Sequence, residues 1–221
     1  MSSIAPEDDG CPNQTEATTD TDPVASTDVT GDGTEDPVHI VTDDDGSEGC
    51  RAFLVVHVDG GAASEPIWLT GRQGGLEEPR INSFVQIDER QGLEILVDEM
   101  SGASTQFVGA FTFVDGRLER IEPPEKAGDI WSGSADGLFP YGGSVGHIEG
   151  ADCAEEGGIV VSAALPAGPA ANTYVVARRF FEVEGAELTL RDTERTVATA
   201  EEVFDDFPEF RASPFGSCSS N

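Results

Sequence analysis

Residues 106–121 read QFVGAFTFVDGRLERI, and this stretch decides the fold class. Its first nine residues are mostly apolar and rich in Phe and Val, and its last five combine charged side chains with Leu118 and Ile121, as short strands do. Asp115-Gly116 separates the two runs, and this dipeptide accepts the positive φ angles that a tight hairpin turn needs. The stretch therefore predicts an antiparallel β-hairpin.

Similar short apolar runs, rich in Val, Ile and Phe, lie on both sides of this hairpin, and no sustained helical periodicity occurs before about residue 195. An acidic turn followed by strands recurs at Asp28, Asp88 and Asp152, which are 60 and 64 residues apart. We therefore expect an all-β fold of three repeated antiparallel β-sheet units, at about 23–70, 81–122 and 143–193. The expected strands include 66–70 in the first unit and 143–148 in the third, with a tight turn at Glu184-Gly185 in the third.

The C-terminal part has a helical pattern. Thr199 and Glu202 have the spacing of a capping box, and Pro208 ends the apolar pattern that follows. We expect one short helix at about 200–206. The domain organisation expected is a disordered acidic tether over 1–22, then a single β domain over 23–221 that includes this helix and the tail.

The formal net charge is −31, and the first 50 residues contain no Lys or Arg. The negative electrostatic field of such a protein repels nucleic acids and anionic membrane surfaces, so we expect neither as a direct partner. No apolar run of about 18 residues is present, and the N-terminus lacks an apolar signal core. The opening has the composition of a tether that follows a removed signal or lipid anchor. This composition predicts a secreted or cell-surface protein.

The four cysteines are Cys11, Cys50, Cys153 and Cys218, and none forms a C-x-x-C motif. An even number in such a chain indicates disulfides and an oxidising compartment. We prefer a bridge between Cys153 and Cys218, which would fasten the C-terminal tail, and the other two would then pair. Free buried thiols are the alternative.

Residues 28–36, DVTGDGTED, have the pattern of a calcium loop. Oxygen-bearing side chains occupy alternate positions, and Gly33 stands where such a loop turns sharply. The expected calcium ligands are Asp28, Thr30, Asp32, Thr34 and Asp36. The loop is not an EF-hand, because His39 stands where a bidentate Glu belongs. An acidic turn that precedes a strand is the alternative interpretation.

With this loop and the repeated units, the chain resembles FG-GAP or VCBS-type repeat proteins, which are related to the calcium-bearing blades of integrin-α-like β-propellers. It also resembles uncharacterised extracellular proteins of actinobacteria. The resemblance implies propeller-blade-like units with a structural calcium. The second and third units depart from it, since Arg90 and Ala154 stand where the family has ligands.

These features favour a secreted or surface-tethered binding or structural module, with a protein or glycan of the cell envelope as its partner. The alternative is an extracellular hydrolase that uses acidic catalytic residues. Residues 142–146 match G-x-S-x-G around Ser144, but the one histidine that follows is His147, and no helix pattern follows it. We therefore predict no catalytic residue, and we do not expect His39, His57 and His147 to form a metal centre.

Overall fold

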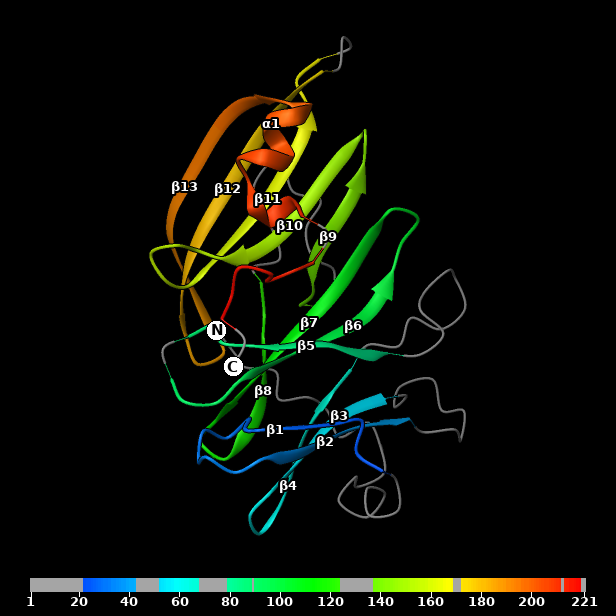
Figure 1. Cartoon of the computed structure of the whole chain (residues 1–221), viewed down its shortest axis with the longest axis vertical. Helices are drawn as coiled ribbons and strands as arrows, with labels where there is room; N and C mark the ends of the chain where they lie inside the picture. Colours follow the sequence, from blue (N-terminus) through cyan, green and yellow to red (C-terminus); the bar gives the residue numbers. More distant parts are fainter. Residues whose placement is uncertain are drawn as a thin grey trace, which may run out of the picture.

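The computed structural model describes residues 22–42, 52–67, 79–88, 90–123, 137–168, 172–211 and 213–219. Within these residues the chain forms two antiparallel β-sheets and one short α-helix, which confirms the all-β class (Figure 1). The predicted tether lies outside this part except for Asp22. None of the described helices is long and apolar enough to cross a membrane.

The first sheet has four strands in the order β1-β2-β3-β4 and lies at one end of the elongated molecule (Figure 1). Its strands are β1 (Ala25–Thr27), β2 (Asp36–Thr42), β3 (Ala52–Val58) and β4 (Gly61–Pro66). Asp59 and Gly60 form the tight turn between β3 and β4. The strand predicted at 66–70 is therefore displaced, because the Asp-Gly turn starts β4 earlier; residues 68–70 lie outside the described part.

The second sheet has nine strands, in the order β13-β12-β11-β10-β9-β7-β6-β5, with β8 also paired to β7. The strands in its middle part are β5 (Arg80–Val85), β6 (Glu94–Ser101), β7 (Thr105–Val114) and β8 (Arg117–Ile121). Those at the far end are β9 (Phe139–Ser144), β10 (His147–Cys153), β11 (Ile159–Pro166), β12 (Thr173–Glu184) and β13 (Glu187–Thr199).

The predicted hairpin at 106–121 is confirmed: β7 and β8 pair around Asp115 and Gly116, whose φ angles are 50° and 80°. The turn predicted at Glu184-Gly185 lies one residue later, at Gly185-Ala186. The strand predicted at 143–148 is wrong, since a turn at Val145-Gly146 divides it into the end of β9 and the start of β10.

Three repeated units are not confirmed. The first unit forms a sheet of its own, whereas the second and third units are joined in one sheet. The joining contact is between β7 and β9, where Thr105 lies opposite Gly142 and Val108 lies opposite Phe139. The described strands do not close into a barrel, because β5 and β13 are opposite edges of the second sheet.

The predicted helix is confirmed as α1 (Ala200–Asp205), and a short 3-10 helix, η2 (Pro208–Phe210), follows it. The capping box is present: the backbone N–H of Thr199 donates to the Glu202 carboxylate at 2.7 Å, and Glu202 N–H donates to the Thr199 hydroxyl at 3.3 Å. Figure 1 shows α1 at the end of the second sheet. Buried Val203 packs there in a cluster with Tyr174 and Phe210.

The core has two large parts that lie on opposite faces of β6. Ile95 and Val97 point toward the first sheet and pack with β3 residues such as Leu54. Leu96 points the other way, into a cluster with Phe139 and Phe215. Because β6 is buried on both faces, its run of apolar residues does not alternate with polar ones.

Candidate functional site

The predicted calcium loop, residues 28–36, comprises the connection 28–35 between β1 and β2 and the first residue of β2, Asp36, which pairs with Thr27. Its carboxylates accept hydrogen bonds from the loop's own backbone. Asp28 accepts the N–H groups of Gly31 and Gly33 at 2.7 and 2.9 Å. This arrangement holds the loop in a tight curl.

The other two aspartates act in the same way. Asp32 accepts the N–H of Thr34 at 2.7 Å. Asp36 is 5% exposed, and one of its oxygens accepts the N–H groups of Val29 and Thr30, each at 2.9 Å. All three predicted acidic ligands therefore have an amide partner within the loop.

The loop nevertheless has two features that fit a cation. The hydroxyl oxygen of Thr30 is buried and has no hydrogen-bond partner among the described residues, which is unusual for a buried polar atom. No Lys or Arg of the described part lies within ion-pair distance of Asp28, Asp32 or Asp36. The oxygens are of the type that calcium binds.

The convergence that a closed site needs is not present in this conformation. Across the described ranges, no three Asp, Glu, His or Cys side chains are grouped so that they could hold a metal ion. The carboxylates face backbone amides instead, and Thr34 is exposed. Calcium would thus have to draw these oxygens together.

A second loop, residues 86–93, connects β5 to β6 and has the same length, eight residues in each case. Glu94 begins β6 as Asp36 begins β2. The Glu94 carboxylate accepts the N–H of Ile87 at 2.7 Å, as Asp36 accepts that of Val29 seven residues before it. This register places Gln86, and not Asp88, at the position of Asp28.

Arg90 supplies a positive charge within the second loop. Its Nε lies 2.6 Å from an Asp88 carboxylate oxygen, and another of its nitrogens donates to Thr112 Oγ1 at 2.9 Å. Thr112 in turn donates to Glu94 at 3.3 Å. By loop position, Arg90 stands where Asp32 stands in the first loop.

The two loops are in direct backbone contact. Leu93 N–H donates to the carbonyl of Asp28 at 3.0 Å. A Cβ at Gly31 would lie 2.4 Å from the backbone of Gln91, and one at Gly92 would lie 2.4 Å from the carbonyl oxygen of Val29. Both glycines also have positive φ angles, so the contact depends on glycine at these positions.

Burial raises the pKa of Glu94 to about 7, and the hydrogen bond from Ile87 N–H opposes this rise. A carboxyl with such a pKa is a candidate general acid where substrate can reach it. Glu94 is 3% exposed, and its oxygens are bonded to Ile87 and Thr112. Its role is therefore structural.

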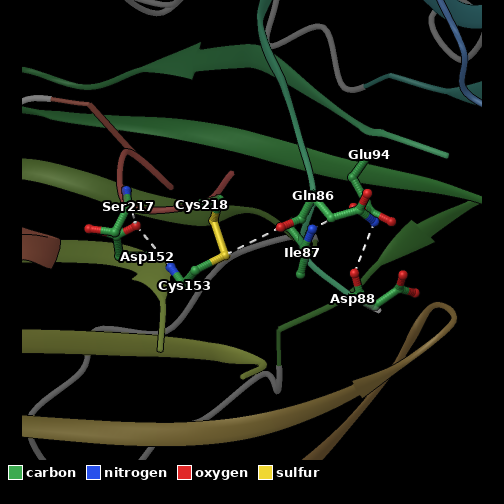
Figure 2. The surroundings of a disulfide bond; sticks show 8 residues. All are labelled: Gln86, Ile87, Asp88, Glu94, Asp152, Cys153, Ser217 and Cys218. Carbon is green, nitrogen blue, oxygen red and sulfur yellow. Dashed lines mark hydrogen bonds between the residues drawn. A yellow bond between two sulfur atoms is a disulfide. The ribbon is translucent and has the colours of Figure 1, made fainter. Parts of the chain in front are cut away.

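The third predicted acidic turn has another role. The Asp152 carboxylate accepts the N–H of Cys153 at 2.8 Å and both the N–H and the hydroxyl of Ser217, at 2.7 and 2.8 Å. Asp152 thus fastens the C-terminal tail beside the disulfide (Figure 2).

The predicted disulfide between Cys153 and Cys218 is confirmed, with 5.0 Å between the Cα atoms. Cys11 and Cys50 lie outside the described residues. The tail continues to Ser219, which forms a β-bridge with Gln86 and accepts its N–H at 2.8 Å. Figure 2 shows the disulfide beside Gln86, so the tail reaches the start of loop 86–93.

An apolar cleft of about 620 Å³ lies between the β9–β10 hairpin and α1 with η2. Val145, Tyr174 and Phe204 line it, together with Arg211. Val145 and Phe204 are exposed, which is uncommon for large apolar side chains grouped around one cleft. No sequence pattern indicates this cleft, because its lining comes from separate segments of the chain, the β9–β10 hairpin, β12 and the α1–η2 region.

Ser144 also lines the cleft, but it lies in a β-hairpin and not in a strand-turn-helix elbow. His147 Nε2 lies 2.9 Å from Thr105 Oγ1. The aromatic residues Phe139, Tyr141 and Phe215 belong to the core.

No protein-family model, no curated protein and no solved structure matched this chain.

Proposed function

We propose that the protein is a secreted or surface-tethered module that binds a protein or glycan of the cell envelope, and that calcium rigidifies its loop at 28–36. The observation that carries the calcium part is a set of three aspartates without a described cationic partner, beside a buried Thr30 hydroxyl oxygen without a hydrogen-bond partner. Calcium would neutralise the carboxylates and would also be coordinated by the Thr30 hydroxyl oxygen.

The second loop supports this proposal because it has the same length and carries its own positive charge. Arg90 there lies 2.6 Å from Asp88. The first loop has the same length but has Asp32 at the position of Arg90. Among the described residues, no Lys or Arg side chain supplies a positive charge to it. An external cation is the simplest replacement.

The disulfide supports the proposed secreted or cell-surface location, since disulfides persist in oxidising environments. We assign the ligand to the apolar cleft, which is lined by exposed Val145 and Phe204 and also by Arg211. The equal lengths of loops 28–35 and 86–93 support the proposal that the chain derives from FG-GAP or VCBS-type repeated units.

The calcium proposal is tested by thermal melting during calcium titration, with EDTA as the reversal. We expect calcium to raise the melting temperature and Asp32→Ala to abolish the rise. Asp192→Ala is the matched control, because Asp192 also accepts a neighbouring backbone N–H at 2.7 Å but lies on β13. An unchanged melting temperature in wild-type protein would refute a structural calcium.

The binding proposal is tested with purified envelope fractions and immobilised protein. Phe204→Asp should weaken binding, because it places a charge in the apolar cleft, whereas Leu190→Asp should not, since exposed Leu190 lies on β13 outside the cleft. Equal binding by both variants would contradict the assignment of the cleft.

A hydrolase remains the second candidate because of a polar cleft of about 390 Å³ that is rich in carboxylates. Three of these are ion-paired: Glu194 and Glu209 with Arg178, and Glu156 with Arg191. The pairing favours a structural role for these carboxylates, so we prefer the binding module.

A further inference from the structure

His39 of β2 and His57 of β3 form a ring pair on the first sheet. His39 lies opposite Val55 in the register, so His57 is its diagonal neighbour on the same face. The ring centroids are 4.9 Å apart, with 71° between the ring planes. The alternate residues of these strands, such as Val38 and Leu54, pack toward the second sheet, so the ring pair lies on the opposite face.

Each ring has a buried nitrogen without a hydrogen-bond partner among the described residues: Nδ1 of His39 and Nε2 of His57. His39 is only 5% exposed. Buried polar side-chain atoms are normally hydrogen-bonded, and an exception calls for a bound ion, a water or a functional role. Two exceptions on adjacent rings call for one common explanation.

The surroundings do not supply a hydrogen-bond partner. Phe53, Val55, Val41 and Ala62 form an apolar cluster on the same face of the sheet. Burial, and secondly the repulsion between the two imidazoles when both are protonated, lowers the pKa of His39 and so favours its neutral form. Neutral imidazole is the form that binds metal ions.

We propose that His39 and His57 bind one divalent transition-metal ion, zinc or copper, through the two unpartnered nitrogens. Imidazole suits these metals, whereas calcium takes oxygen ligands, so this site is chemically distinct from the loop at 28–36. The described part offers no third Asp, Glu, His or Cys ligand beside the pair, so the two imidazole nitrogens are the ligands that this part of the chain supplies. The acidic protein attracts the cation, and the bound ion links β2 to β3.

The test uses the full chain under non-reducing conditions with calcium present, so that oxygen sites are occupied. Zinc or copper alone is titrated by calorimetry. The chain has three histidines, and His147, which is bonded to Thr105 on the other sheet, provides a matched control. We expect one ion per chain, and we expect His39→Gln and His57→Gln each to weaken binding at least about tenfold while His147→Gln leaves it unchanged.

A spectroscopic readout keeps the test decisive if a variant does not fold. Zinc should shift the imidazole NMR signals of two of the three histidines in wild-type protein, and bound copper should show coupling to imidazole nitrogen. The proposal is overturned if zinc and copper do not bind, if the His39 and His57 variants bind as well as wild type, or if only the signal of His147 shifts. Because calcium is present throughout, failure here leaves the proposed calcium loop untouched.

Discussion

Loops 28–35 and 86–93 have the same length, each lies before a strand that begins with an acid, and each acid accepts a backbone N–H seven residues before it. They differ in their charge balance. The second loop includes Arg90, which forms an ion pair with Asp88. In the first loop the charged side chains are all acidic, and no Lys or Arg among the described residues pairs with its aspartates.

The difference teaches that one backbone shape can be stabilised in two ways. In the first loop a carboxylate accepts from amides, as Asp28 does from Gly31 and Gly33. In the second loop the corresponding residue, Gln86, donates from its side chain to the carbonyl of Asp88 at 2.9 Å (Figure 2) and to that of Arg90 at 2.7 Å. The acidic version leaves negative charge to be neutralised, and the amide version does not.

The largest expected effect is from removing the disulfide with Cys153→Ser and Cys218→Ser. The closed segment spans 65 residues, so the free energy of unfolding should fall by about 4 kcal/mol. Chemical denaturation measures this loss. Because Ser219 holds Gln86, hydrogen exchange should accelerate in loop 86–93 more than in loop 28–35. Equal acceleration in both loops would show that they open as one unit.

The next effect is from Gly31→Ala, which would separate the two loops. A methyl group there meets the Gln91 backbone and also strains a positive φ angle, so unfolding should become easier by at least about 2 kcal/mol. Gly33→Ala is the matched control, since Gly33 has a similar φ and open space around it. Equal melting temperatures for the two variants would argue against a stabilising contact between the loops.

A smaller effect is expected from Arg90→Gln, which removes the positive charge of the second loop. The Arg90 side chain is 40% exposed, so solvent screening limits the loss to about 1 kcal/mol. The loss should be the same with and without calcium, as should that of the control Arg80→Gln, whose ion pair with Asp98 lies elsewhere. A loss seen only without calcium would mean that both loops share one cation.

A further effect is in the pH dependence of stability, tested with Glu94→Gln. The folded pKa of about 7 lies above the ordinary value of 4.5, so the folded state binds extra protons between these values. This carboxyl therefore favours folding below pH 4.5, and that contribution is lost as the pH rises through 7. Melting curves recorded from pH 4.5 to 8 should show that the variant loses less stability with rising pH than the wild-type protein does. An identical pH profile in wild type and variant would contradict this role.

Local features of the fold were predictable because they depend on neighbouring residues. Asp115-Gly116 gave its hairpin, and Thr199 with Glu202 gave the capped helix. The same rule applied to Asp59-Gly60 would have found the β3–β4 turn. The spacing of the aspartates did not predict that Gln86, and not Asp88, occupies the position of Asp28 in the second loop. This correspondence depends on where the flanking strands begin and end.

The sequence by itself determined the all-β class, the short helix and the acidic character, since turn chemistry, periodicity and charge are encoded over a few residues. Only the tertiary structure decided that β7 pairs with β9, that Gly31 and Gly92 let two loops touch, and that His39 lies beside His57. These contacts join segments that are not neighbours in the chain, and they follow from strand pairing within each sheet and from packing between the two sheets. No local pattern specifies such packing.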